Sequence, residues 1–136
     1  MKKIINTQFI KFAGIGILNT AIDFFILKLI MHFGDGSISW FMVSKAFAVT
    51  GATTNSFVMN RFWTFKTTKK IKEDISPFLI ISALGMLINV SVGSLSYGFL
   101  IDHLVSNVAT NISAVFAASA SFLFNYFGYK YFVFKG

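Results

Sequence analysis

Basic and aromatic residues gather in one short stretch of this chain, NRFWTFKTTKKIKED (Asn60–Asp74), where they could bind an anion. Arg61 can form two parallel hydrogen bonds to a phosphate group. Trp63 offers a flat face for stacking, and the amide of Asn60 can both donate and accept hydrogen bonds. The chain shows no paired carboxylates, no nucleophile beside a base and no phosphate-cradling loop. We therefore expect a binding protein rather than an enzyme, with no metal and no cofactor.

A second set of polar residues is scattered through otherwise apolar sequence. Asn19 and Asp23 are four positions apart, so they share one face if their segment is helical. Lys45 and Asn55 share a face of the next segment with two alanines between them. Asn89 occupies the corresponding place in the third segment. Small residues and buried amides commonly serve helix packing in membranes, and packing explains Asn111 and most of the Gly, Ala and Ser positions on these faces.

The composition shows what must position these residues. Of the 136 residues 55% are hydrophobic and only 12% are charged, with a mean hydropathy of +0.70. A soluble domain carries about a quarter charged residues, and one this small could not bury so much apolar surface. The bilayer core takes about 20 apolar residues per helix. We predict an all-α membrane protein with one domain over residues 1–136 and four transmembrane helices, at about 9–31, 38–59, 77–101 and 107–128.

Lysine and arginine residues set the predicted orientation. The amino end, the central basic loop 61–74 and the carboxyl end together hold ten of the twelve. The two opposite loops hold none. Since cytoplasmic loops carry the excess of positive charge, both termini and the central loop are predicted to lie in the cytoplasm. The ten residues are Lys2, Lys3, Lys11, Arg61, Lys66, Lys69, Lys70, Lys72, Lys130 and Lys135.

The chain also contains an internal match. NSFVMNRFWTFK (Asn55–Lys66) and NYFGYKYFVFK (Asn125–Lys135) share Asn-x-Phe, a basic residue, two aromatic residues, a β-branched residue, Phe and Lys, with one residue of slippage. FIKFAGIGILN (Phe9–Asn19) likewise resembles FLIISALGMLIN (Phe78–Asn89) with one insertion. The pattern predicts two helical hairpins repeated in parallel, related by an axis along the membrane normal.

Asp23 and Lys45 are expected at similar depths in adjacent helices. A lone charge near the bilayer centre costs about 2.5–3.5 kcal/mol even on lenient scales, so we predict an ion pair between them. The pair could be purely structural, or it could form the floor of a polar cavity that contacts a sugar or a phosphate.

Three features resemble the GtrA family. They are the run N-R-F-W-T-F (Asn60–Phe65), Ile22–Asp23 following G-x-x-N, and the echo K-Y-F-V-F (Lys130–Phe134). The resemblance covers essentially the whole chain, although Tyr131 and Phe132 stand where many relatives have Arg and Trp. It implies a multi-pass protein of the bacterial cytoplasmic membrane that moves a polyprenyl-phosphate-linked monosaccharide to the outer leaflet. There a separate glycosyltransferase would decorate O-antigen, teichoic acid or another surface polysaccharide.

Two groups of residues would serve that role. A headgroup site for phosphate and sugar is expected from Arg61, Asn60, Trp63, Phe65, Asn55, Asn125 and Lys130. A polar pathway across the membrane is expected from Asn19, Asp23, Lys45 and Asn89. The expected partners are the lipid-linked sugar, membrane lipids, a membrane glycosyltransferase and a second copy of this chain.

Three other functions compete with translocation. A non-translocating adaptor would recruit the glycosyltransferase through the basic loop. A small proton-coupled drug exporter also has four helices and one acid in the first, but an acid beside Lys45 would not cycle protons easily. Nucleic-acid binding is disfavoured because the basic run is short and tethered to the membrane.

Overall fold

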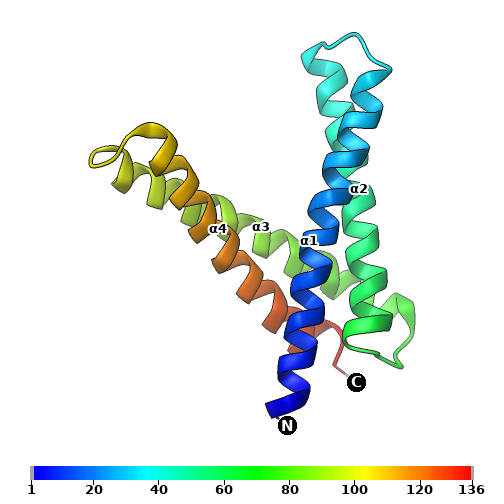
Figure 1. The fold of residues 1–136 in the computed structure, drawn as a ribbon. Helices are drawn as coiled ribbons and strands as arrows, with labels where there is room; N and C mark the ends of the chain where they lie inside the picture. The colour runs from blue at the N-terminus through cyan, green and yellow to red at the C-terminus, as the bar shows by residue number, and fades with distance from the viewer. Residues whose placement is uncertain (1, 136) are drawn as a thin grey trace. The chain divides into compact units, whose positions relative to one another are not determined.

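The computed structural model describes the backbone of residues 2–135 and the side chains of residues 7–37 and 39–135. Lys2 and Lys3, on which the charge argument partly rests, have side chains outside this set. Helices make up all the regular structure of the described backbone, which contains no strand, so the all-α prediction is confirmed. In chain order they are α1 (Lys2–His32), α2 (Ile38–Met59), the π-helical turn η1 (Asn60–Thr64), α3 (Ile71–Ile101), α4 (Ser106–Gly128) and the π-helical turn η2 (Tyr129–Val133). Figure 1 labels α1 to α4.

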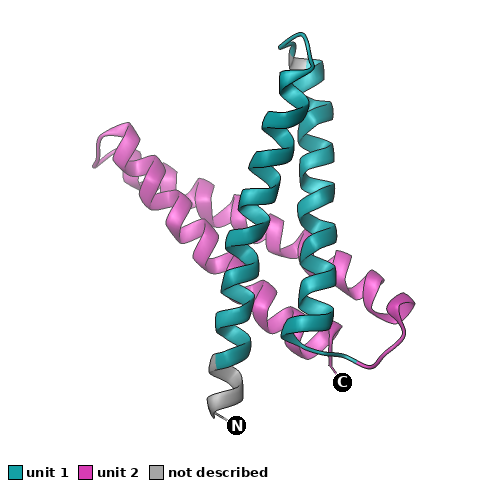
Figure 2. Ribbon diagram, turned by 45° about the vertical axis from the view of Figure 1, so that its right-hand side comes forward, with its two compact units in different colours: residues 1–67 teal, residues 68–136 magenta. Residues whose placement is uncertain are grey.

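The chain forms two compact units, Met1–Thr67 and Thr68–Gly136 (Figure 2). In the first unit α1 packs along α2, and in the second α3 packs along α4. Each unit is therefore an antiparallel helical hairpin that ends in a π-helical turn.

Three helical segments are long and apolar enough to cross a membrane: Thr7–His32, Ile71–Ile101 and Ser106–Val133. The fourth predicted span is α2, which has 22 residues. At 1.5 Å per residue that is about 33 Å, enough for a bilayer core. It carries Lys45, Asn55 and several serines and threonines among its apolar residues. The chain is thus a multi-pass membrane protein.

Two predicted boundaries were wrong. The first helix starts at Lys2 rather than near residue 9, and the third starts at Ile71 rather than at Pro77. Glu73 and Asp74 lie in the first turn of α3, where acidic side chains interact favourably with the helix dipole. Pro77 is consequently inside the helix rather than in its first turn, and the non-helical part of the basic loop shrinks to residues 65–70.

The connection between α1 and α2 is fixed by local hydrogen bonds. Ser37 caps α2, its Oγ accepting the backbone N–H of Trp40 at 3.2 Å. The Trp40 indole N–H then donates to the carbonyl of Ile30 at 3.1 Å, near the end of α1. Gly36 has a φ of 73°, a left-handed conformation that glycine adopts without a Cβ clash. This tight turn holds the two helices of the first unit at one end.

In the second unit, aromatic rings pack together at the end away from the loop between α3 and α4. Phe78 of α3 lies 4.9 Å from the ring centroid of Tyr129 and 6.3 Å from that of Phe134. Ser82 and Tyr129 form a hydrogen bond of 2.6 Å between their hydroxyls. In the first unit Phe12 of α1 and Phe65 make a comparable contact at 6.4 Å. The segments after η1 and η2 are thereby anchored to the first helix of their own unit.

Candidate functional site

Both copies of the basic and aromatic motif adopt the same unusual backbone. After α2 the Phe65 N–H donates to the Asn60 carbonyl at 2.9 Å, and after α4 the Phe134 N–H donates to the Tyr129 carbonyl at 2.8 Å. These five-residue hydrogen bonds define π-helical turns, which are rare and often occur at functional sites. Sequence reasoning missed them, although the matching motif marked both places.

In η1 the polar residues are buried and the rings are exposed. Asn60 is fully buried and its amide Nδ2 donates to Ser56 Oγ of the preceding turn at 3.2 Å. The Arg61 side chain is only 4% exposed, and its Cζ lies 5.4 Å from the ring centroid of Phe62. Trp63 is 45% exposed. Of the predicted headgroup residues, Asn60, Arg61 and Trp63 therefore share this turn, in which the two polar side chains are buried and the indole is exposed.

Two lysines cap the π-helical turns. Lys11 of α1 donates from Nζ to the Trp63 carbonyl at 3.3 Å and lies 5.2 Å from the centroid of the Trp63 ring. Lys69 donates to the Val133 carbonyl at 3.3 Å. A cation at a helix C-terminus interacts favourably with the carbonyls left open there. These contacts span 52 and 64 positions of the chain, so the sequence pattern indicates only the role of the two lysines in orientation.

Lys130 is the motif's basic residue in η2. It is half-buried and its Nζ lies 5.7 Å from the Tyr126 ring centroid and 5.5 Å from that of Tyr131. A cation held over two rings can still donate hydrogen bonds to an anion. The aromatic residues at this end therefore position the amine rather than neutralise it.

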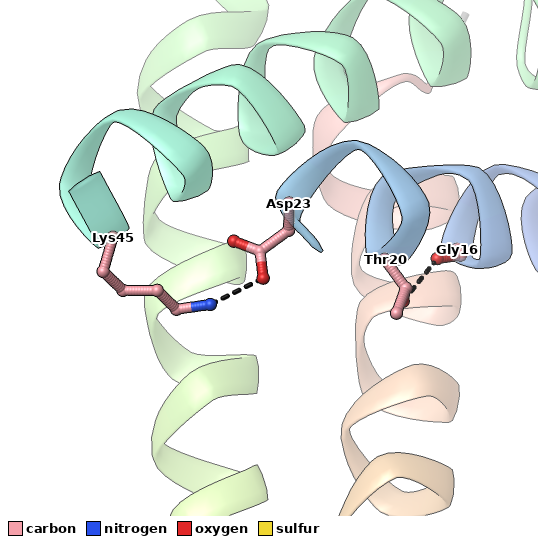
Figure 3. A network of polar contacts seen from close by, with 4 residues as sticks. All are labelled: Gly16, Thr20, Asp23 and Lys45. Atoms are coloured by element: carbon pink, nitrogen blue, oxygen red, sulfur yellow. Dashed lines mark hydrogen bonds and ion pairs between the residues drawn. The ribbon is translucent and has the colours of Figure 1, made fainter. Parts of the chain in front are cut away.

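The first unit carries two polar contacts between its helices, of which the sequence predicted only the Asp23–Lys45 pair. Asn55 donates from Nδ2 to Asn19 Oδ1 at 2.7 Å. About one turn further along α1, Lys45 Nζ and Asp23 Oδ2 form an ion pair of 2.6 Å, confirming the pairing (Figure 3). The side chains of Lys45 and Asp23 are 42% and 26% exposed, respectively. The pair is thus accessible along the hairpin rather than sealed between its helices.

The second unit has polar contacts of a different kind. Asn89 donates from Nδ2 to Ser121 Oγ at 3.0 Å. Asn125 packs against the backbone of Gly85, where an added Cβ would approach Asn125 Oδ1 to 2.1 Å. The buried Oδ1 of Asn125 has no hydrogen-bond partner among the described residues. Asn125 therefore retains an open acceptor on the helix that leads into η2.

The side chains at these positions are amides, amines, a guanidinium, a carboxylate and aromatic rings. Among the described side chains, no three His, Cys, Asp or Glu residues gather to form a metal site. The predicted residues fall into two sets, one in each unit. The first holds Asn19, Asp23, Lys45, Asn55, Asn60, Arg61, Trp63 and Phe65, and the second holds Asn89, Asn125 and Lys130.

The comparison with known families settles the relationship. The model of the GtrA/DPMS transmembrane domain matches residues 11–134, nearly the whole chain. The chain belongs to the GtrA/DPMS family. No curated protein matches it closely enough to count as a relative.

Membership in the GtrA/DPMS family confirms the resemblance drawn from the motifs. It indicates a membrane protein involved in the handling of polyprenyl-phosphate-linked sugars. Both π-helical turns and all four α-helices contribute residues to the matched region.

Proposed function

We propose that this GtrA/DPMS protein moves a polyprenyl-phosphate-linked monosaccharide from the cytoplasmic to the outer leaflet of the bacterial cytoplasmic membrane, without catalysing a reaction. The delivered sugar would supply a membrane glycosyltransferase that decorates a cell-surface polysaccharide such as O-antigen or teichoic acid. Its cargo combines an anion, a polar sugar and a long apolar tail. A protein that carries it needs a cationic end and a polar route through apolar helices.

The observation that carries the proposal is the polar face of the first hairpin. Starting from the capped turn η1, the pair Asn19–Asn55 and then the pair Asp23–Lys45 follow each other along α1 and α2. From Lys11 to Asp23 the helix rises about 18 Å at 1.5 Å per residue. Polar groups thus accompany a headgroup over more than half of a 30 Å bilayer core. Hydrogen bonds along this route would replace those that the sugar loses on leaving water.

We also propose that both termini and the central loop face the cytoplasm and that the two hairpins are parallel repeats. The charge distribution supports the orientation. The equal hydrogen-bond pattern of η1 and η2 supports the repeat. On this basis Arg61 and Lys130 occupy matching positions at the cytoplasmic ends of the two hairpins, where each would contact the phosphate.

Reconstitution tests the proposal. Purified protein would be placed in liposomes with a labelled polyprenyl-phosphate monosaccharide in both leaflets. An impermeant reagent that destroys exposed sugar then consumes about half of the label without transport, and all of it when the protein moves lipid between leaflets. We expect Asn19→Leu to slow this exchange at least tenfold. Consumption of the inner-leaflet label by Asn19→Leu at the native rate, or consumption of only about half of the label with the native chain, would contradict the proposal.

Thr20→Leu is the matched control for Asn19→Leu. Thr20 neighbours Asn19, is exposed, and donates only to the Gly16 carbonyl of its own helix at 3.0 Å. The two variants gain similar apolar bulk, so they differ in whether the polar face is interrupted. We expect the control to exchange lipid at the native rate.

The pattern of buried and exposed side chains in η1 supports the alternative function of an adaptor. Since Asn60 and Arg61 are buried while Phe62 and Trp63 are exposed, the outer surface of this turn is aromatic and could bind a partner protein. An adaptor would co-purify with a glycosyltransferase and move no lipid in liposomes. If the protein is an adaptor, Trp63→Ala should abolish co-purification with the glycosyltransferase. If the protein translocates lipid, Trp63→Ala should instead reduce lipid exchange between the leaflets.

A further inference from the structure

The second hairpin contains a recess between α3 and α4, toward the loop that joins them. Its volume is about 380 Å³, and it is shallow and broadly open to the outside of the hairpin. The lining residues are Gly93, Ser94, Tyr97, Thr110, Ser113 and Ala114. We refer to it as the α3–α4 recess.

One buried hydroxyl in the α3–α4 recess has no hydrogen-bond partner among the described residues. Ser113 is only 4% exposed, and its Oγ has no hydrogen-bond partner among the residues that the structure describes. By contrast, the neighbouring Thr110 donates to the Ser106 carbonyl of its own helix at 2.8 Å. A buried hydroxyl left without a partner costs about 1–3 kcal/mol. A polar group bound in the recess would remove that cost.

In the first hairpin, the positions that correspond to two residues of the recess lining carry the Asp23–Lys45 ion pair. Counted from the matched asparagines of the first and third helices, Asp23 corresponds to Gly93, four residues further on. Counted back from the matched basic residues of η1 and η2, Lys45 corresponds to Ala114. The second hairpin thus has a glycine and an alanine where the first has its ion pair. The missing side chains leave the recess open and without charge.

We propose that the α3–α4 recess binds the neutral sugar ring of the lipid-linked cargo. This inference rests on the proposed function and adds the place where the sugar is recognised. Three hydroxyl side chains can pair with sugar hydroxyls, and Tyr97, which is 37% exposed, offers a ring to stack against. A volume at the low end of ligand pockets fits one monosaccharide rather than an oligosaccharide.

The recess and the cationic end of the same hairpin cannot hold one headgroup at the same time. Lys130 follows Ser113 by seventeen residues, which is about 25 Å of helix. In the cargo the sugar is bonded directly to the phosphate. The recess is therefore a second binding site, which the sugar would occupy after the phosphate has left Lys130.

The test compares ligand binding by a variant that fills the recess with binding by a matched control. Ala114→Phe projects a ring into the recess, whereas Val115→Phe adds it at a neighbouring position that is 65% exposed and outside the lining. Native mass spectrometry in nanodiscs would measure three probes: a polyprenyl phosphate bearing glucose, galactose or N-acetylglucosamine in turn, the same lipid without sugar, and the free sugars.

We expect the native chain to bind at least one sugar-bearing lipid about tenfold more tightly than the sugar-free lipid. Ala114→Phe should reduce that preference below twofold while binding the sugar-free lipid unchanged, which also shows that it is folded. Val115→Phe should keep the preference. Ser113→Ala should lower it about three- to tenfold, the effect of one hydrogen bond.

Each contrary result has a distinct meaning. If Ala114→Phe keeps the preference, if the native chain shows none, or if only free sugar binds, the recess is not the site for the lipid-linked sugar. If the preference depends on the recess but liposomes show no exchange between leaflets, the recess stands and the translocation proposal fails.

Discussion

Removing one charge from the Asp23–Lys45 pair should destabilise the protein far more than removing both. Asp23→Asn leaves Lys45 charged in an apolar helix, and Lys45→Met leaves Asp23 charged. The double variant leaves no charge there. The three variants form a double-mutant cycle, which isolates the interaction between the two side chains.

The structure gives the size of the effect. At an effective dielectric constant of about 20, unit charges 2.6 Å apart attract each other by about 6 kcal/mol. Most of this offsets the cost of taking both ions out of water. A single charge left in the helix costs about 2.5–3.5 kcal/mol. We therefore expect each single substitution to lower the free energy of unfolding by about 2–4 kcal/mol, and the double variant to lose less than either.

Reversible unfolding in mixed micelles, followed by tryptophan fluorescence, measures these differences. Lys28→Met is the control, since it removes the same charge from an exposed lysine whose Nζ lies 5.1 Å from the Phe24 ring centroid. It should change stability by less than about 1 kcal/mol. Additive losses from the two single substitutions would refute the reasoning. Normal lipid exchange by the uncharged double variant would show that the pair is structural and not part of the polar pathway.

Two further predictions concern the second hairpin. Gly85→Ala should lower the free energy of unfolding by about 1–3 kcal/mol, because the new methyl group would displace the Asn125 amide; Gly98→Ala, which meets nothing within 4 Å, should not. Thermal unfolding in detergent distinguishes the two, and equal losses would contradict the packing described. Tyr129→Phe removes the hydrogen bond to Ser82 and should cost about 1 kcal/mol in the same assay; an unchanged midpoint would show that this bond contributes nothing.

Contacts could be predicted from the sequence where helix periodicity and the expected depth in the membrane place two side chains close together. The Asp23–Lys45 pair follows from two charges at similar depths in adjacent helices, and the structure contains it. The helical hairpins follow from apolar length alone. The start of α3 was misplaced because Pro77 was taken as a boundary, whereas the helix begins six residues earlier, at Ile71, with Glu73 and Asp74 in its first turn.

Other features could not be derived from the sequence. A π-helical turn differs from an α-helical one by a single hydrogen-bond register, and a five-residue segment such as Asn60–Thr64 has too little periodicity to reveal it. The caps by Lys11 and Lys69 depend on how distant segments fold together. The buried hydroxyl of Ser113 could not be recognised either, because a single serine in an apolar helix does not reveal whether its side chain has a partner.

The internal pairing of polar side chains bears on how the protein is made. Asn19 with Asn55 and Asp23 with Lys45 lie entirely within the first hairpin, and Asn89 with Ser121 lies entirely within the second. The first hairpin can therefore pair Asp23 with Lys45 and Asn19 with Asn55 before the rest of the polypeptide has left the ribosome. The insertion machinery can release the amino-terminal half into lipid without waiting for the carboxyl-terminal half to be translated.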